Sequence, residues 1–260
     1  MNGGRRVDLI GLGFDPVTMA QVIETCVGWC REPRQSHTVV TANASHLCAM
    51  RRDPELARAC SVGDLVVADG MSVVWASRWA GDGFPERVAG VDLMTLLLEV
   101  ASRLHLRVYF LGARPEVVTD VVEACRTRCP DAVVAGSRDG YFTSAEHDGI
   151  VEAIRAARPD MLFIGMPTPF KETWAERHRA RLDVPVIMGV GGSFDVLAGH
   201  IQRAPRWVQS MGMEWSWRLL MEPRKLWRRY LTTNSEFLWL AARHAIRRRM
   251  RRSATPQERP

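Results

Sequence analysis

The most informative absences in this sequence are those of common catalytic motifs. There is no GxxxxGK[ST] phosphate loop, no HExxH pair, no GxSxG elbow and no DxD motif, and the seven histidines are scattered. These absences argue against a P-loop nucleotidase, a zincin and an α/β-hydrolase. No internal repeat is present either. Function must therefore be sought in less common patterns.

Cysteine pairs of the CxxC kind are also absent. The six cysteines include two CxxxC pairs, Cys26/Cys30 and Cys125/Cys129, and this spacing places both thiols of a pair on one helix face. Such thiols pack in a core more often than they bind metal, so we predict no metal site. The arginines near the N-terminus precede an apolar stretch that aspartate and glycine soon interrupt, unlike a signal peptide. Free thiols suit a cytoplasmic protein.

Long apolar runs are missing as well. The longest near the C-terminus is Phe237–Ala242, far short of the ~20 residues that span a bilayer. Positive charge is unevenly distributed: residues 218–252 contain eleven Lys or Arg and two Glu, a net charge of +9, and residues 253–260 are neutral. Because the whole chain carries +6, residues 1–217 carry −3. The basic character belongs to the C-terminus.

What the sequence does contain is a regular alternation of short β-rich runs with amphipathic stretches. The predicted strands are Val7–Leu12, Thr38–Thr41, Leu65–Ala68, Val108–Leu111, Val133–Ala135, Met161–Ile164 and Val184–Val190. The predicted helices include Val17–Trp29, Met94–Leu104, Glu116–Arg128, Ala145–Ala157 and Lys171–Arg181. This alternation predicts an α/β fold over residues 1–202, a Rossmann-like and mostly parallel sheet with helices on both faces.

Several predicted strands end in glycine or polar residues, among them Gly11-Leu12-Gly13, Thr41-Ala42-Asn43 and Gly189-Val190-Gly191. In open α/β sheets the ligand lies beyond the carboxyl ends of the strands, so these ends favour a nucleotide or phosphate ligand. The third glycine of a dinucleotide fingerprint would fall on Pro16, which weakens the case for NAD.

The composition changes from about Arg203. Five of the nine tryptophans lie between there and the C-terminus, interspersed with arginine, and aromatic and apolar residues recur at helical spacing. We predict a helical, basic and aromatic appendage over residues 203–252 that contacts an anionic membrane surface. A disordered tail is expected over 253–260. Nucleic acid is not an expected partner, because no recognised module is present and the body is acidic.

The stretch from Thr41 to Asp92 carries the densest pattern. Read alone, Asp69 before Gly70 is typical of a helix cap. Thr41 and Asn43 fit a turn in which side chains bond the backbone, and Arg87 fits a solvated surface position. The residues by themselves leave these structural interpretations open beside a catalytic one.

Taken together, these motifs resemble the WecG/TagA/CpsF family of bacterial glycosyltransferases. The pattern is TANASH at 41–46, ADG at 68–70 and ERVAGVD at 86–92. The resemblance continues in the segments 108–113, 139–142, 169–172, 189–195, 203–207, 212–215 and 218–223, and covers roughly residues 7–232. One such motif would mean little, whereas this many in register are specific.

The resemblance implies transfer of a hexose-type sugar (ManNAc, ManNAcA or GlcA) from a UDP-sugar to a polyprenyl-diphosphate-linked saccharide in cell-surface polysaccharide synthesis. The reaction would invert the anomeric centre without metal or other cofactor. An enzyme without a DxD motif must neutralise the diphosphate with cationic side chains and backbone N–H groups. The expected location is the cytoplasm, at the inner face of the cytoplasmic membrane.

The resemblance also assigns residues. Asp69 would be the general base, Thr41 and Asn43 would line its pocket, and Arg87 would meet the charge on the leaving diphosphate. Gly112, Tyr141, Gly191 and Asp195 resemble parts of the nucleotide pocket. The other predicted substrate-binding residues are Lys171, Glu172 and Arg203, together with Arg218, Lys225 and Arg228 of the appendage, which are candidates to touch a diphosphate.

One segment departs from the family pattern. The family typically reads Gly-x-Pro-Lys-Gln-Glu, whereas this chain has Pro167-Thr168-Pro169-Phe170-Lys171-Glu172. Under one hypothesis Lys171 restores the displaced cation and favours an acidic donor such as a UDP-uronic acid. Under the other, the change is neutral.

Two other classes of function fit parts of the sequence. One is an NAD- or flavin-dependent oxidoreductase on a Rossmann-like sheet, and the other is a non-catalytic basic membrane adaptor. Protection from unfolding by UDP but not NAD would exclude the first, and loss of activity in Asp69→Asn would exclude the second. A sheet body with an arginine-rich arm is also compatible with self-association as a homo-oligomer.

Overall fold

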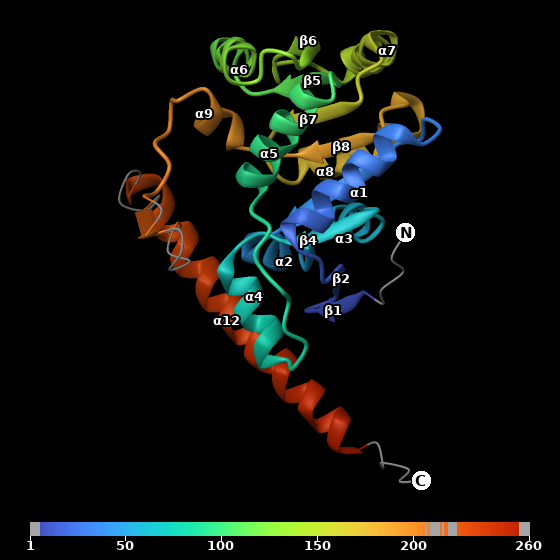
Figure 1. Cartoon of the computed structure of the whole chain (residues 1–260). Coiled ribbons are helices and arrows are strands. Elements are labelled where there is room, and N and C mark those ends of the chain that lie inside the picture. Colours follow the sequence, from blue (N-terminus) through green and yellow to red (C-terminus); the bar gives the residue numbers. More distant parts are fainter. Residues whose placement is uncertain (1–5, 206, 209–213, 215, 218–222, 255–260) are drawn as a thin grey trace.

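The core of the protein is a single six-stranded parallel sheet, seen in the computed structural model of the chain (Figure 1). The structure describes residues 6–205, 207–208, 214, 216–217 and 223–254, and for 223–232 and 251–254 the backbone alone. The strand order is β4-β3-β8-β7-β5-β6. The strands are β3 (His37–Ala42), β4 (Leu65–Ala68), β5 (Arg107–Gly112), β6 (Val133–Arg138), β7 (Met161–Gly165) and β8 (Val186–Gly189). Each overlaps a predicted strand, which confirms the predicted sheet.

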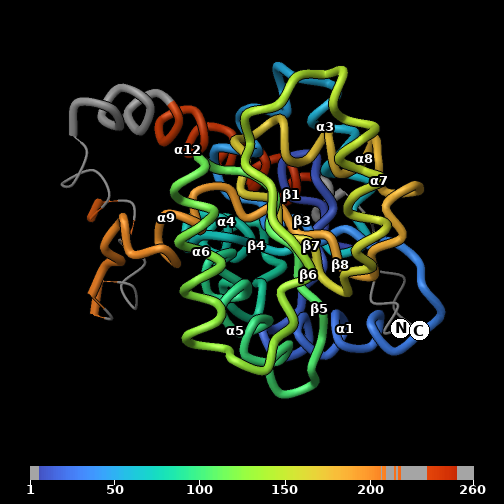
Figure 2. Tube along the Cα trace, turned by 90° about the horizontal axis from the view of Figure 1, so that it is seen from above, coloured from blue at the N-terminus to red at the C-terminus, as the bar shows by residue number. Residues whose placement is uncertain are grey.

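Helices cover both faces of this sheet, as predicted. One face carries α1 (Met19–Arg31), α5 (Gly90–Arg103), α6 (Pro115–Arg128) and α9 (Ser193–Leu197). The other carries α7 (His147–Ala157), with η1 (Ser144–Glu146) before it, and α8 (Phe170–Leu182); beside β3 and β4 it carries α2 (Ala44–Met50), α3 (Pro54–Ser61) and α4 (Met71–Trp79). Figure 2 shows α1 and α5 on one side of the strands and α3, α7 and α8 on the other.

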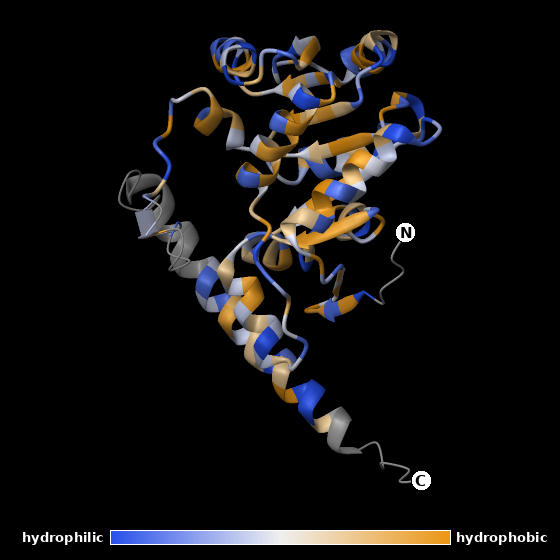
Figure 3. Cartoon of the chain, in the orientation of Figure 1, coloured by the Kyte–Doolittle hydropathy of each residue, from blue (hydrophilic) through white to orange (hydrophobic). Residues whose placement is uncertain are grey.

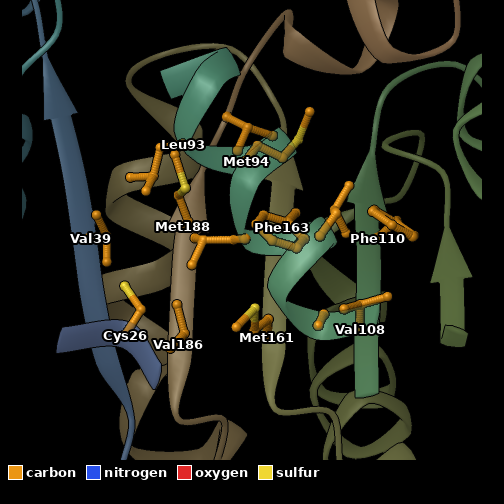
Figure 4. Packing of buried hydrophobic residues seen from close by; sticks show 14 of the residues in the cluster. Cys26, Val39, Leu93, Met94, Val108, Phe110, Met161, Phe163, Val186 and Met188 are labelled. Carbon is orange, nitrogen blue, oxygen red and sulfur yellow. The ribbon is translucent and has the colours of Figure 1, made fainter. Parts of the chain in front are cut away.

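The alternation of side chains along each strand fills these two layers. Val39 packs in the cluster under α1 and α5, whereas the next residue, Val40, packs in the cluster under α2 and α4. Figure 4 shows the first cluster, in which Phe110, Phe163 and Met188 from three neighbouring strands meet Met94 of α5. Because β4 and β7 are covered on both faces, they are apolar throughout, whereas the edge strand β6 also contains Ser137 and Arg138 (Figure 3).

The prediction for Val7–Leu12 was wrong. This segment forms an antiparallel hairpin, β1 (Val7–Leu9) and β2 (Leu12–Phe14), outside the main sheet. Ile10 and Gly11 both adopt positive φ, at 57° and 86°, as a two-residue turn that matches the strand twist requires. Gly11-Leu12-Gly13 is therefore a hairpin turn and not a phosphate loop at the edge of the sheet.

The predicted helical C-terminus is confirmed by α12 (Pro223–Ala254), which runs along α2 and α4 (Figure 1). Phe237, Leu240 and Ala241 on its inner side belong to the same buried cluster as Leu47 and Val74. Packing therefore fixes this helix to the body. Residues 255–260, most of the predicted tail, lie outside the described residues. Within the described part, no helix has the length and apolarity to cross a bilayer.

Candidate active site

Asp69 and Thr41 lie side by side at the carboxyl edge of the sheet. The backbone N–H of Asp69 donates to the carbonyl of Ala42 over 2.9 Å, which joins the end of β4 to the end of β3. Gly90, the first residue of α5, closes the group: a Cβ built there would lie 3.1 Å from Thr41 Oγ1 and 3.8 Å from Asp69 Oδ2. The absence of a side chain at position 90 therefore lets the start of a helix approach both residues.

The surroundings of Asp69 raise its pKa above the ordinary aspartate value. Burial is the main reason that its pKa is raised, and the like charge of Glu214 adds to it. His46, Arg87 and a hydrogen bond from the Gly90 backbone oppose the rise without cancelling it. A carboxyl group with a raised pKa is well suited to take a proton at neutral pH.

Asp69 is not the cap of the helix that follows it. The N-cap of α4 is Gly70, which makes no side-chain capping bond. Asn43, by contrast, is a helix cap: its Oδ1 accepts from the backbone N–H of Ser45 over 3.0 Å and of His46 over 3.3 Å at the start of α2. A Cβ at Gly70 would lie 4.0 Å from Asn43 Cβ, which places Asn43 beside the Asp69–Gly70 turn. Asn43 can therefore cap α2 and still lie beside Asp69, as the sequence predicted.

Arg87 lies in a network of alternating charges next to Asp69. Its Nη1 donates to Glu214 Oε2 over 2.5 Å, and its Nη2 lies 3.8 Å from Asp92 Oδ2. Arg203 pairs with both oxygens of Asp92, at 2.5 Å and 2.6 Å, and lies 3.5 Å from Glu214. The network joins the loop before α5, the first turn of α5, and positions 203 and 214 between α9 and α12. We call it the Arg87 network.

A second, buried cluster lies between α2 and the start of α8. His46 Nε2 lies 2.9 Å from Glu172 Oε1, and Thr168 Oγ1 donates to the same oxygen over 3.1 Å. Lys171 Nζ donates to Thr168 Oγ1 over 2.8 Å and is paired with Glu172. His46, Lys171 and Glu172 are each less than a tenth exposed. The charge of Lys171 therefore already has a partner within the cluster.

Burial determines how the two basic groups of this cluster titrate. It lowers the pKa of Lys171 to about 8, against the opposing effects of Cys60 and Asp69. Burial and the neighbouring Lys171 charge lower the pKa of His46 to about 3, so that His46 is neutral at physiological pH. Both groups interact electrostatically with Asp69. The cluster thus extends the polar surroundings of the Asp69 site.

The ends of β5, β7 and β8 form a different kind of surface. A pocket of about 240 Å³ is lined by Ala113, Arg114, Gly165, Met166, Pro167, Gly191, Gly192 and Asp195. Gly112 approaches Gly165 so closely that a Cβ would lie 2.7 Å from the Gly165 carbonyl carbon. The stem of Lys171 runs beside Gly189 and Gly191 and links this pocket to the buried cluster. Two predicted residues, Gly191 and Asp195, line the pocket, and Gly112 adjoins it.

Tyr141 lies on the loop after β6 and is 69% exposed. Its backbone N–H donates to Asp139 Oδ1, and the preceding Gly140 N–H donates to the Ala113 carbonyl, both over 2.8 Å. The loop is therefore held against the end of β5, next to the pocket. Arg218 lies outside the described residues, and only the backbone of Lys225 and Arg228, in the first turns of α12, is described.

Several members of these clusters had no role in the sequence prediction. His46 is part of the predicted TANASH motif, and its position three residues after a capping Asn was the available signal. Glu214 and Asp92 also fall in quoted motifs, but sequence alone does not show that both pair with arginines distant in the chain.

In the described part of the chain, no group of three or more His, Cys, Asp or Glu could hold a metal ion.

Comparisons with known proteins agree with the resemblance drawn from the motifs. A family model described as "Glycosyl transferase WecG/TagA/CpsF family" matches residues 7–251. Proteins named N-acetylglucosaminyldiphosphoundecaprenol N-acetyl-beta-D-mannosaminyltransferase are similar to this chain. The one from Bacillus spizizenii is 34% identical over 194 residues, 75% of this chain and 74% of the relative. The one from Staphylococcus aureus is 32% identical over 224 residues, 86% and 87% of the two chains. The chain therefore belongs to the WecG/TagA/CpsF family of glycosyltransferases.

Proposed function

We propose that this protein transfers an N-acetylmannosamine-type sugar from a UDP-sugar to a polyprenyl-diphosphate-linked saccharide, with inversion and without a metal. The names of its relatives describe transfer of an N-acetyl-β-D-mannosaminyl group to N-acetylglucosaminyldiphosphoundecaprenol. A β-linked product formed from an α-linked donor requires attack from the face opposite the leaving group. ManNAcA and GlcA are the other donor sugars that we consider.

The position and pKa of Asp69 are the observation that carries this proposal. Its carboxylate would accept the proton of the acceptor hydroxyl while that oxygen attacks the anomeric carbon. Thr41, adjacent to the same glycine, would orient the acceptor or the sugar. The raised pKa supports this role, because a base works best when its pKa approaches the working pH.

Arg87 and the glycine-lined pocket support a diphosphate-linked leaving group. Arg87 interacts electrostatically with Asp69, and its side chain is only 15% exposed, so that its charge acts with little screening by water. The pocket at the ends of β5, β7 and β8 would hold the nucleotide where ligands of open α/β sheets bind. In the proposed mechanism, transfer breaks the bond from the anomeric carbon to the diphosphate oxygen, and Arg87 stabilises the charge on that oxygen.

A donor screen tests the reaction. UDP-ManNAc, UDP-ManNAcA and UDP-GlcA are each incubated with a synthetic polyprenyl-diphosphate GlcNAc acceptor, and UDP release and the linkage of the product are measured. We expect acceptor-dependent UDP release with UDP-ManNAc and a β-linked product. An α-linked product would contradict inversion. Protection from thermal unfolding by NAD but not by UDP would instead favour an oxidoreductase.

We further propose that residues 203–252 hold the enzyme at the inner face of the cytoplasmic membrane. The outer side of α12 carries exposed apolar residues spaced by about two turns and then one turn: Leu238 is 53% exposed, Ile246 54% and Met250 66%. Arg243 lies over the ring of Trp239, 5.1 Å from its centroid. A helix whose inner face is packed and whose outer face is apolar and basic suits the headgroup region of an anionic bilayer.

Replacement of outer arginines tests this attachment without uncovering the core, which truncation would do because α12 packs on it. Each cation near the surface contributes on the order of 1 kcal/mol, so Arg243→Ala combined with Arg247→Ala should weaken binding to anionic vesicles about 30-fold. The matched control is Arg126→Ala with Arg128→Ala at the end of α6, which removes the same charge elsewhere. Equal losses in both double variants would contradict a membrane face on α12.

A further inference from the structure

The pairing of Arg87 with Glu214 has a consequence for donor binding. The two side chains form a charge-assisted bond of 2.5 Å, and Arg87 is only 15% exposed. Such bonds are about twice as strong as neutral ones. Any anion that is to bind Arg87 through the same atoms must compete with the carboxylate of Glu214.

The charges around Arg87 do not favour a further anion. The described groups that pair within the Arg87 network are two guanidiniums, Arg87 and Arg203, and two carboxylates, Asp92 and Glu214, so that their charges balance. A nucleoside diphosphate would bring additional negative charge next to the two carboxylates that these guanidiniums already neutralise. Like charges at such distances disfavour binding unless one of them departs or protons are taken up.

Glu214 is the carboxylate best able to depart. Asp92 is fixed in the first turn of α5, where the helix N-terminus stabilises it, and Arg203 binds both of its oxygens. Asp69 directly follows β4. Glu214 lies on the segment between Arg203 and α12, and its carboxylate contacts Arg87 closely and Arg203 more distantly.

We propose that Glu214 is an intramolecular competitor for Arg87, which its carboxylate releases when the diphosphate of a nucleotide-sugar donor binds. This inference rests on the proposed function, because it assigns Arg87 to the diphosphate. Binding of the donor and release of Arg87 by Glu214 are linked, and by reciprocity any change that weakens the pair of Arg87 and Glu214 strengthens donor binding. Glu214 thereby couples the nucleotide site to the C-terminal part of the chain.

The test is the affinity for UDP, measured by calorimetry on the full-length protein. In Glu214→Gln the competing charge is gone while the side chain keeps its size, and we expect UDP to bind about tenfold more tightly. In Arg87→Gln, UDP should bind more weakly than in the wild type. When both substitutions are combined, the gain from Glu214→Gln should disappear, because the competition takes place at Arg87.

Two control variants test whether the change in UDP affinity is specific to the charge of Glu214. Glu236→Gln removes another carboxylate that pairs the C-terminal region with the body, through Arg52, and should leave UDP affinity unchanged. Glu214→Asp keeps the charge and should remain within about threefold of the wild type, with thermal melting used to verify folding. Unchanged or weaker binding in Glu214→Gln, or an equal gain in Glu236→Gln, would overturn the inference. Failure of the wild type to bind UDP at all would instead contradict the proposed function.

Discussion

The two halves of the carboxyl edge of the sheet carry different kinds of residues. At β3 and β4 the edge carries charged side chains, with Asp69 beside Thr41 and the Arg87 network next to them. At β5, β7 and β8 it carries glycines, with Arg114 and Asp195 as the charged side chains, around a pocket of about 240 Å³. Under the proposed function, the first half would supply the groups that move a proton and meet charge, and the second would supply the space for the nucleotide.

This difference shows how one scaffold separates chemistry from binding. Charged groups at the first half are close enough to shift one another's pKa values, so a substitution of Asp69 there should affect mainly the reaction rate. At the second half the important property is the close approach of main chains, so substitutions there should affect packing and ligand affinity. The comparison therefore predicts a loss of reaction rate for Asp69 variants, and a loss of stability or ligand affinity for variants of the glycine-lined half.

The largest effect is expected at Asp69. Asp69→Asn removes the base but keeps the shape of the side chain, and the rate of sugar transfer should fall ~10²–10⁴-fold with UDP affinity little changed. Steady-state UDP release and calorimetry measure the two quantities. Asp120→Asn, at a surface pair with His200, is the matched control and should keep its activity within about twofold. A comparable loss of UDP affinity in Asp69→Asn would break the proposed separation.

The next largest effect is expected at Gly112. It has φ of 118°, and an added Cβ would lie 2.7 Å from backbone of Gly165. Gly112→Ala should lower the free energy of unfolding by about 2–4 kcal/mol, because strain and overpacking add. Gly191→Ala is the matched comparison: φ is 52°, but the nearest atoms lie 3.7 Å away, so we expect about 1 kcal/mol. Urea unfolding measures both, and equal losses would contradict a packing role specific to Gly112.

The pH dependence of kcat/KM provides a third test. Asp69 acts as a base only when it is ionised, so activity should fall as the pH falls through its pKa, by up to about tenfold per pH unit. Because burial raises this pKa, the midpoint should lie above the ordinary aspartate value of about 3.9. His46, with a pKa of about 3, does not titrate in that range. A midpoint at or below the ordinary value would contradict the role of Asp69.

The sequence predicted those features that depend on a local residue pattern and missed those that do not. The strands of the main sheet were predictable because covered parallel strands are continuous apolar runs, as at Leu65–Ala68. The hairpin at Ile10 and Gly11 was missed because an apolar run does not reveal that two adjacent residues take positive φ. Three short helices, α2 to α4, were also not predicted. Each spans nine residues or fewer, too short for a clear helical period.

At the candidate site, too, the sequence could not show contacts between residues that are distant in the chain. The family resemblance placed Asp69, Thr41 and Arg87 in one site, and the structure brings these residues together. The partner of Arg87 is separated from it by 127 positions in the chain, and no local pattern encodes such a contact. For the same reason the sequence could not show that the charge of Lys171 is paired inside a buried cluster.

The smallest effect is expected for Lys171, and it tests how the two halves communicate. Its stem lies against the glycines of the pocket, while its ammonium group contacts Thr168 and Glu172 in the buried cluster. Because that charge already has a partner, Lys171→Gln should change kcat/KM by a few-fold and equally for UDP-ManNAc, UDP-ManNAcA and UDP-GlcA. If Lys171 instead recognised an acidic donor, only the two uronic acid donors would lose activity. Steady-state kinetics with the three donors separates these outcomes, and a selective loss would mean that the side chain leaves Glu172 to reach into the pocket.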